Sequence, residues 1–307
     1  MNHTLKFIFQ IFFFVEFITG ILGNGFIALG NISGRFKRRK ISLVDHILTA
    51  LAVSRLTLLW SMVISVTLNT LCPHLLMNSE MVRVSVIICI VTNHFSIWIA
   101  TCLSIFYFLK IASFSNSPFL YLKWRIKKVI LVTLLVSLVP LVLNTVVKET
   151  YVDFFISGYN GHTPSNSMQF SKVSLFTNSM FMLIPFILSL IGFYLLMFSL
   201  WKHHRKMQQK AQIPRDASTT AHKKALKIVL AFLMLYAMCL LILVIKISSS
   251  ELMENDVIIL CDYTSGIAFP SGNSFVLILG NNKLRHVTLS VPWWLRCKSK
   301  DVETFDP

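Results

Sequence analysis

The sequence is poor in charged residues, and in acidic residues above all. Only 14% of its 307 residues are charged, and 13 acidic residues stand against 29 lysines and arginines. The mean hydropathy is +0.68. A soluble domain of this length is rarely so apolar, because its surface must face water. The composition therefore argues against a soluble protein and favours a membrane protein.

Patterns typical of several reaction classes are also absent. There is no HExxH metal motif, no pair of intramembrane aspartates and no glycine-rich phosphate loop. No lysine occurs between Val257 and Asn282, which excludes a retinal Schiff base in that stretch. We therefore expect neither an enzyme nor a bound cofactor.

Cysteine is missing from the middle of the chain. None of the six cysteines lies between Cys102 and Cys239, so a loop in that interval cannot be stapled to the third apolar stretch. The sequence gives no sign of a disulfide framework. Cys297 follows two tryptophans in the tail, where palmitoylation is an open alternative.

What the sequence does have is seven long apolar stretches. A helix needs about 20 apolar residues to cross the hydrocarbon core, and the alternation typical of a barrel strand is absent. We expect an all-α membrane protein, a bundle of seven transmembrane helices in one domain over residues 1–307, with a short tail at 280–307. The predicted spans are Phe7–Gly30, Ile47–Leu71, Val84–Leu109, Val129–Val147, Val173–Trp201, Ile228–Ile245 and Val257–Leu279.

The basic residues are distributed unevenly about these spans. Twenty-three of the 29 fall in alternate connections and in the tail, which predicts an extracellular amino terminus and a cytoplasmic carboxyl terminus. This distribution explains the net charge of +16 without nucleic acid. Topology accounts for most of these charges, and contact with anionic membrane lipids or an acidic partner is the alternative for a share of them.

Two charged residues lie inside predicted spans and need an explanation, because a charge at the bilayer centre costs at least about 2.5–3.5 kcal/mol. They are Glu16 and Arg55. We expect Arg55 to bond to Asn24 of the first span and to Asn273 and Ser274 of the seventh. This cluster is either a structural polar lock or a switch that rearranges on activation, and the two roles are compatible.

The third span carries the clearest candidates for a binding site. Cys89, Asn93 and Ile97 are four residues apart and share one helix face, with His94 beside them. These polar groups either join helices or line a cavity. Four large side chains in the later spans, which either pack or contact a ligand, are Phe186, Tyr236, Ile259 and Tyr263.

Runs along nearly the whole chain resemble the type 2 (bitter) taste receptors, a family of G-protein-coupled receptors. The matching runs are Leu48–Arg55, Asn93–Thr101, Phe106–Ala112, Phe119–Arg125, Ile184–Phe186 with Ser189-Leu190, Pro270-Ser271, Leu277–Asn281 and Lys283–Arg285. Each run alone is a weak signal, and together they are specific.

The resemblance implies a receptor of the plasma membrane that is activated by bitter small molecules. It implies a partner, a heterotrimeric G protein of the gustducin type, and signalling through phospholipase C and calcium. The motif match puts Cys89, Asn93, His94, Phe186, Tyr236, Ile259 and Tyr263 on ligand-pocket positions. It puts Tyr107 and Lys110 at the inner end of the third span. Whether Lys206, Lys223, Lys224 and Lys227 dock the G protein or only set topology stays open, as does homo- or hetero-oligomerisation.

Three positions depart from the family pattern. Many relatives have tryptophan at Cys89, and most have histidine at Asn273, where asparagine cannot ionise. The glycosylation sequon usual in the second outer loop is missing, and the one outward-facing sequon is at Asn2.

Two other functions compete with this interpretation. A pheromone-type chemosensory receptor would share the architecture, but the second and seventh spans disfavour it. A channel or transporter would need a continuous polar path, for which the spans offer only Glu16, Arg55, His94 and Asp262.

Overall fold

The computed structural model describes residues 3–36, 42–71, 79–112, 114, 116–159, 167–208, 217–248 and 256–280, which contain eight helices. Six of them are long and apolar enough to cross a membrane. Helix α9 has 25 residues, or about 37 Å of helix, and completes a set of seven. The helices are α1 (His3–Phe36), α2 (Leu43–Leu71), α3 (Ser79–Ile111), α4 (Ser117–Trp124), α5 (Ile126–Tyr159), α6 (Ser167–Gln208), α7 (Ala217–Ser248) and α9 (Asp256–Gly280).

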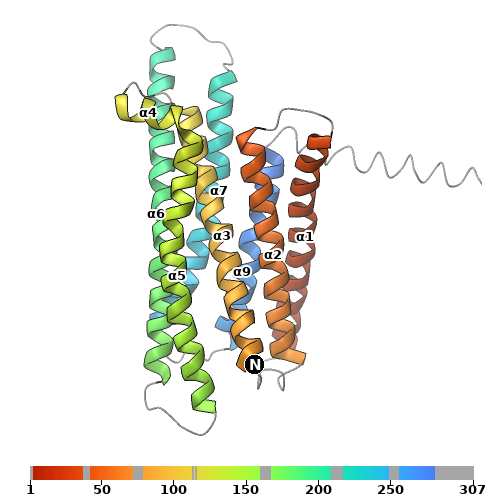
Figure 1. Cartoon of the computed structure of the whole chain (residues 1–307). Coiled ribbons are helices and arrows are strands. Elements are labelled where there is room, and N and C mark those ends of the chain that lie inside the picture. The colour runs from red at the N-terminus through yellow and green to blue at the C-terminus, as the bar shows by residue number, and fades with distance from the viewer. Residues whose placement is uncertain are drawn as a thin grey trace, which may run out of the picture.

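Each of the seven predicted spans lies inside one of the long helices, so the prediction of a seven-helix bundle is confirmed. Helix α3 runs through the middle of the bundle and contacts α2, α5, α6 and α7. Helix α9 packs against α1, α2 and α7 (Figure 1). Because α3 contacts four of the other long helices, more than one face of α3 is turned toward the interior.

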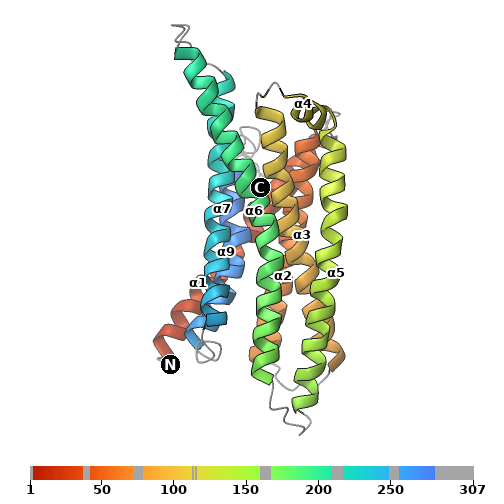
Figure 2. The ribbon, with the colours of Figure 1, turned by 90° about the vertical axis from the view of Figure 1, so that its left-hand side faces the viewer.

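Helix α4 was not predicted as a separate element. It lies at the ends of α3 and α5, as Figure 2 shows, and we call this end of the molecule the basic end. Phe119 of α4 is buried against Phe108 and Phe114, and Lys123 Nζ donates to the carbonyl of Ala112 at 3.0 Å. The exposed cations here are Lys110, Arg125, Lys127, Lys128, Lys202, Arg205, Lys223 and Lys227.

The outward faces of the long helices are apolar. On α5, for example, Leu135, Val139, Val142 and Val146 are 56–61% exposed. In water such a surface would be unstable, whereas lipid chains cover it without cost. The bundle is therefore built to be surrounded by lipid, with polar groups turned inward.

Helices α1 and α9 approach each other closely at Gly20. The Ser271 hydroxyl of α9 donates to the carbonyl of Glu16 at 2.8 Å. A Cβ built on Gly20 would lie 2.8 Å from Leu59 Cδ1 and closer still to Ser271 Oγ. Glycine lets the three helices approach this closely, because a side chain here would force Ser271 or Leu59 to shift.

Candidate ligand-binding site

A cavity of about 380 Å³ opens inside the bundle toward the end opposite the basic end, which we call the pocket end. This volume falls within the range of small-molecule sites, about 300–1,000 Å³. Six helices form the wall. The lining residues are Met62, Ser65, Met81, Ser85, Val86, Cys89, Ile90, Asn93, His94, Ile97, Trp98, Asn144, Lys148, Asn178, Phe181, Met182, Pro185, Tyr236 and Tyr263.

Helix α3 supplies the largest share of this wall. The stripe that the sequence marks, Cys89, Asn93 and Ile97, faces the cavity together with His94. His94 Nε2 lies 3.3 Å from Ser137 Oγ of α5, while the Ser137 hydroxyl donates to the carbonyl of Leu134 at 2.7 Å. Because the one hydroxyl proton is used there, Ser137 accepts from an Nε2–H of His94. That hydrogen bond fixes the ring of His94 at the cavity wall.

The large side chains predicted from the later spans fall into three groups. Tyr236 and Tyr263 line the cavity, and the Tyr236 hydroxyl donates to the carbonyl of Met182. Phe186 does not line it; its ring packs edge-on against Tyr236 with centroids 5.5 Å apart. Ile259 lies in α9, but its side chain is outside the described residues. The structure thus brings five of the seven predicted residues together.

Sequence reasoning missed the walls that α2, α5 and α6 contribute. Met62 and Ser65 come from α2, Asn144 and Lys148 from α5, and Asn178 from α6. Asn144 and Lys148 are four residues apart, so a polar stripe on an otherwise apolar helix was available as a signal. The fourth and fifth predicted spans contain no charged residue, and a single asparagine in such a span does not by itself predict a cavity wall.

The expected hydrogen bonds of Arg55 do not form. Arg55 is 1% exposed, and its Nε and Nη1 have no hydrogen-bond partner among the described residues. Asn24 instead donates to the carbonyls of Gly20 and Pro270, at 2.9 and 3.4 Å, and Ser274 also donates to Pro270. These two side chains turn to the backbone because the carbonyl of Pro270 lies between them. The direct Arg55 network was therefore wrong.

Arg55 nevertheless shares a small void with two other predicted residues, Asn273 and Tyr107. The amide nitrogen of Asn273 also has no partner among the described residues. Both groups are donors, so neither satisfies the other. The void lies between the predicted polar network and Tyr107, toward the basic end of α3.

Of the cations predicted for the G-protein side, Lys110, Lys223 and Lys227 are exposed at the basic end. The side chains of Lys206 and Lys224 lie outside the described residues, as do Asn2, Cys297 and the tail. Among the residues that the structure describes, Cys89, Cys102, Cys239 and Cys261 form no disulfide with one another.

Comparison with known proteins finds one family over nearly the whole chain. The model of the taste receptor protein (TAS2R) family matches residues 1–296. The mouse (Mus musculus) taste receptor type 2 member 110 is 53% identical over 98% of this chain and 97% of its own length. Member 123 of Rattus norvegicus is 53% identical over 99% and 97% of the two chains, and member 14 of Macaca mulatta is 50% identical over 99% and 97%.

Proposed function

The chain belongs to the taste receptor type 2 (TAS2R) family and is a multi-pass protein of the plasma membrane, and we propose from this that it is a G-protein-coupled receptor for bitter small molecules. The family match supports this function over the pheromone-type alternative. The family consists of taste receptors, which are not an enzyme class, and this supports the expectation that the chain is not an enzyme. The observation that carries the ligand-binding part of the proposal is the 380 Å³ cavity at the pocket end.

In this proposal the pocket end faces outward and the basic end faces the cytoplasm. Exposed cations gather at the basic end, in agreement with the bias of cytoplasmic loops toward lysine and arginine. An agonist enters from outside and contacts Asn93, His94, Cys89 and Tyr263 along the cavity wall. Because the wall is mostly apolar with a few polar groups, hydrophobic burial supplies most of the affinity and the polar groups orient the ligand.

Tyr236 connects the cavity wall to the buried interior of the bundle. It is fully buried, and its ring lies 5.6 Å from Phe232 and 5.6 Å from Phe269, centroid to centroid. Phe232 in turn lines the void that holds Arg55. A ligand that shifts Tyr236 would therefore displace a packed aromatic column that ends beside the polar network.

Activation follows if the agonist binds the rearranged column better than the resting one, because a ligand with equal affinity for both states shifts nothing. A differential of about 1–3 kcal/mol is typical of such coupling. We propose that the inner ends of α3, α6 and α7 then open to a gustducin-type G protein, which signals through phospholipase C to calcium. Tyr107, Lys110, Lys206, Lys223, Lys224 and Lys227 would form the docking side.

The test is calcium release in cells that express this chain with a promiscuous taste-type G-protein chimera and are given a panel of bitter compounds. A response that requires the chimera supports the proposal, and a current or substrate flux without any G protein would support a channel or transporter instead. Asn93→Ala should weaken the response at matched surface expression. Thr145→Ala is the control, since Thr145 bonds its own helix backbone outside the cavity wall.

A further inference from the structure

The cavity wall carries a formal charge at one place. Lys148 of α5 is the only lysine, arginine, aspartate or glutamate in the part of the wall that the structure describes. It is half-buried near the pocket end. A charge that is partly removed from water interacts more strongly with an opposite charge than a surface charge does. Lys148 can therefore select ligands by their charge.

Two amides beside Lys148 extend this corner of the cavity. Asn144 lies one turn from Lys148 on the same face of α5, and its Nδ2 donates to Asn178 Oδ1 at 3.4 Å. The Nδ2 of Asn178 meets the sulfur of Met182 at 3.9 Å, which is a weak acceptor. Lys148 and Asn178 thus offer N–H donors at the junction of α5 and α6.

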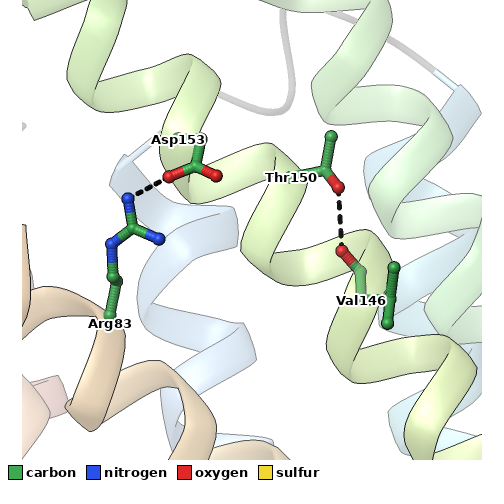
Figure 3. Close-up of polar contacts among 4 residues, drawn as sticks. All are labelled: Arg83, Val146, Thr150 and Asp153. Carbon is green, nitrogen blue, oxygen red and sulfur yellow. Dashed lines mark hydrogen bonds and ion pairs between the residues drawn. The ribbon is translucent and has the colours of Figure 1, made fainter.

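Two acids lie near Lys148 on α5, and neither lines the cavity. Glu149 follows Lys148 directly, and Asp153 is bonded by Arg83, which reaches it from α3 outside the cavity wall (Figure 3). On another face of α5, the hydroxyl of Thr150 bonds the helix backbone at Val146. Lys148 also has a contact with the protein. An ammonium group has three N–H donors, so such a contact leaves donors for a ligand.

Other lining residues are apolar and adaptable. Met62 and Met81 are unbranched and flexible, and Val86 and Ile90 of α3 also line the cavity. Such a surface adapts to apolar ligand groups of different shape. The cavity therefore combines a flexible apolar wall with one cationic corner.

We propose that the preferred agonists of this receptor are apolar molecules with one carboxylate or sulfonate, whose anionic group binds Lys148 and Asn178 at the α5–α6 corner. This inference rests on the proposed function and names the ligand class for the same cavity. A charge-assisted hydrogen bond to an ammonium is stronger than a neutral one. Its loss should cost about tenfold or more in agonist potency.

The test compares matched compounds on matched variants. Naphthoate, biphenylcarboxylate and larger fused-ring aromatic acids are each assayed beside the methyl ester and primary amide of the same skeleton, with calcium release as the readout. The receptors are wild type, Lys148→Met, Lys148→Arg and the control Lys172→Met. Lys172 is a half-buried cation on α6 that does not line the cavity, so the control removes the same charge elsewhere at the pocket end.

We expect the acids to be at least tenfold more potent than their esters and amides on wild type. Lys148→Met should abolish that difference while neutral agonists keep their potency, which also shows that the variant folds. Lys148→Arg should retain most of the preference, and Lys172→Met all of it. If neutral compounds activate the receptor and the acids gain nothing from Lys148, the anion inference is overturned and the proposed function stands. If no bitter compound of any charge activates surface-expressed receptor, both fail.

Discussion

Replacing Gly20 by alanine should destabilise the bundle through clashes with two side chains, Ser271 and Leu59. A Cβ at this position would overlap Ser271 Oγ, lie 2.8 Å from Leu59 Cδ1 and lie 3.2 Å from Ser271 Cβ. Leu59 is fully buried in a tight cluster, so its side chain has little room to withdraw. Overpacking of this kind costs about 1–3 kcal/mol. Displacing Ser271 also breaks its bond to the Glu16 carbonyl, which contributes about 1 kcal/mol.

The expected total is a loss of about 2–4 kcal/mol, set against the small gain in helix propensity that alanine brings. The assay is the thermal unfolding midpoint of purified receptor in one detergent at one scan rate, with surface expression as a second readout. Gly25→Ala and Gly192→Ala are the controls. A Cβ at either position meets nothing within 4 Å, so both variants should be unchanged or slightly stabilised.

A second substitution makes the reasoning specific. Ser271→Ala removes the Oγ atom that the new Cβ would meet first, so it should be less costly in the Gly20→Ala background than in wild type. A double-mutant cycle measures that difference. Two outcomes would contradict the predicted clash between a Cβ at Gly20 and Ser271. One is equal stability of Gly20→Ala and Gly25→Ala, and the other is the same loss from Ser271→Ala in both backgrounds.

Three further outcomes are expected. Alanine at Arg83 or Asp153 should lower the free energy of unfolding by only about 0.2–1 kcal/mol, because the two side chains are 38% and 54% exposed. The charge-swapped pair, Arg83→Asp with Asp153→Arg, should restore the thermal midpoint. A larger loss would show that the pair does more than join α3 to α5. Arg55→Met should leave the thermal midpoint unchanged or raise it, since Nε and Nη1 of this buried guanidinium have no partner among the described residues. The same variant should reduce agonist-evoked calcium release. A large drop in stability would contradict this account. Tyr236→Phe should lower the free energy of unfolding by about 1 kcal/mol, because it removes the hydrogen bond to the Met182 carbonyl. Tyr236→Ala should lower it by about 3–5 kcal/mol, because it also removes the buried ring. Equal thermal midpoints for the two variants would contradict a packed aromatic column.

The stripe on α3 shows how far local pattern reaches. Cys89, Asn93 and Ile97 share a face on any helix, because the 3.6-residue period fixes it. The sequence could therefore predict that they face the same surroundings, and all three line the cavity. It could not predict that Asn144 and Lys148 face the same space from α5, since that depends on how α5 is rotated against its neighbours. Phe186 was misplaced for the same reason, because it packs behind Tyr236 and not beside the cavity.

The sequence by itself determined the seven spans and the gathering of cations at alternate connections. Both follow from quantities that are local in the chain, namely the length of an apolar run against the bilayer thickness and the charge of the segments between runs. Only the tertiary structure decided which polar side chains meet. Asn24 and Ser274 bond to the carbonyl of Pro270 and leave Arg55 without the expected bonds, because positions 24, 55 and 270 come together only when α1, α2 and α9 pack. The cationic corner at Lys148 was decided in the same way, by the packing of α5 against α6.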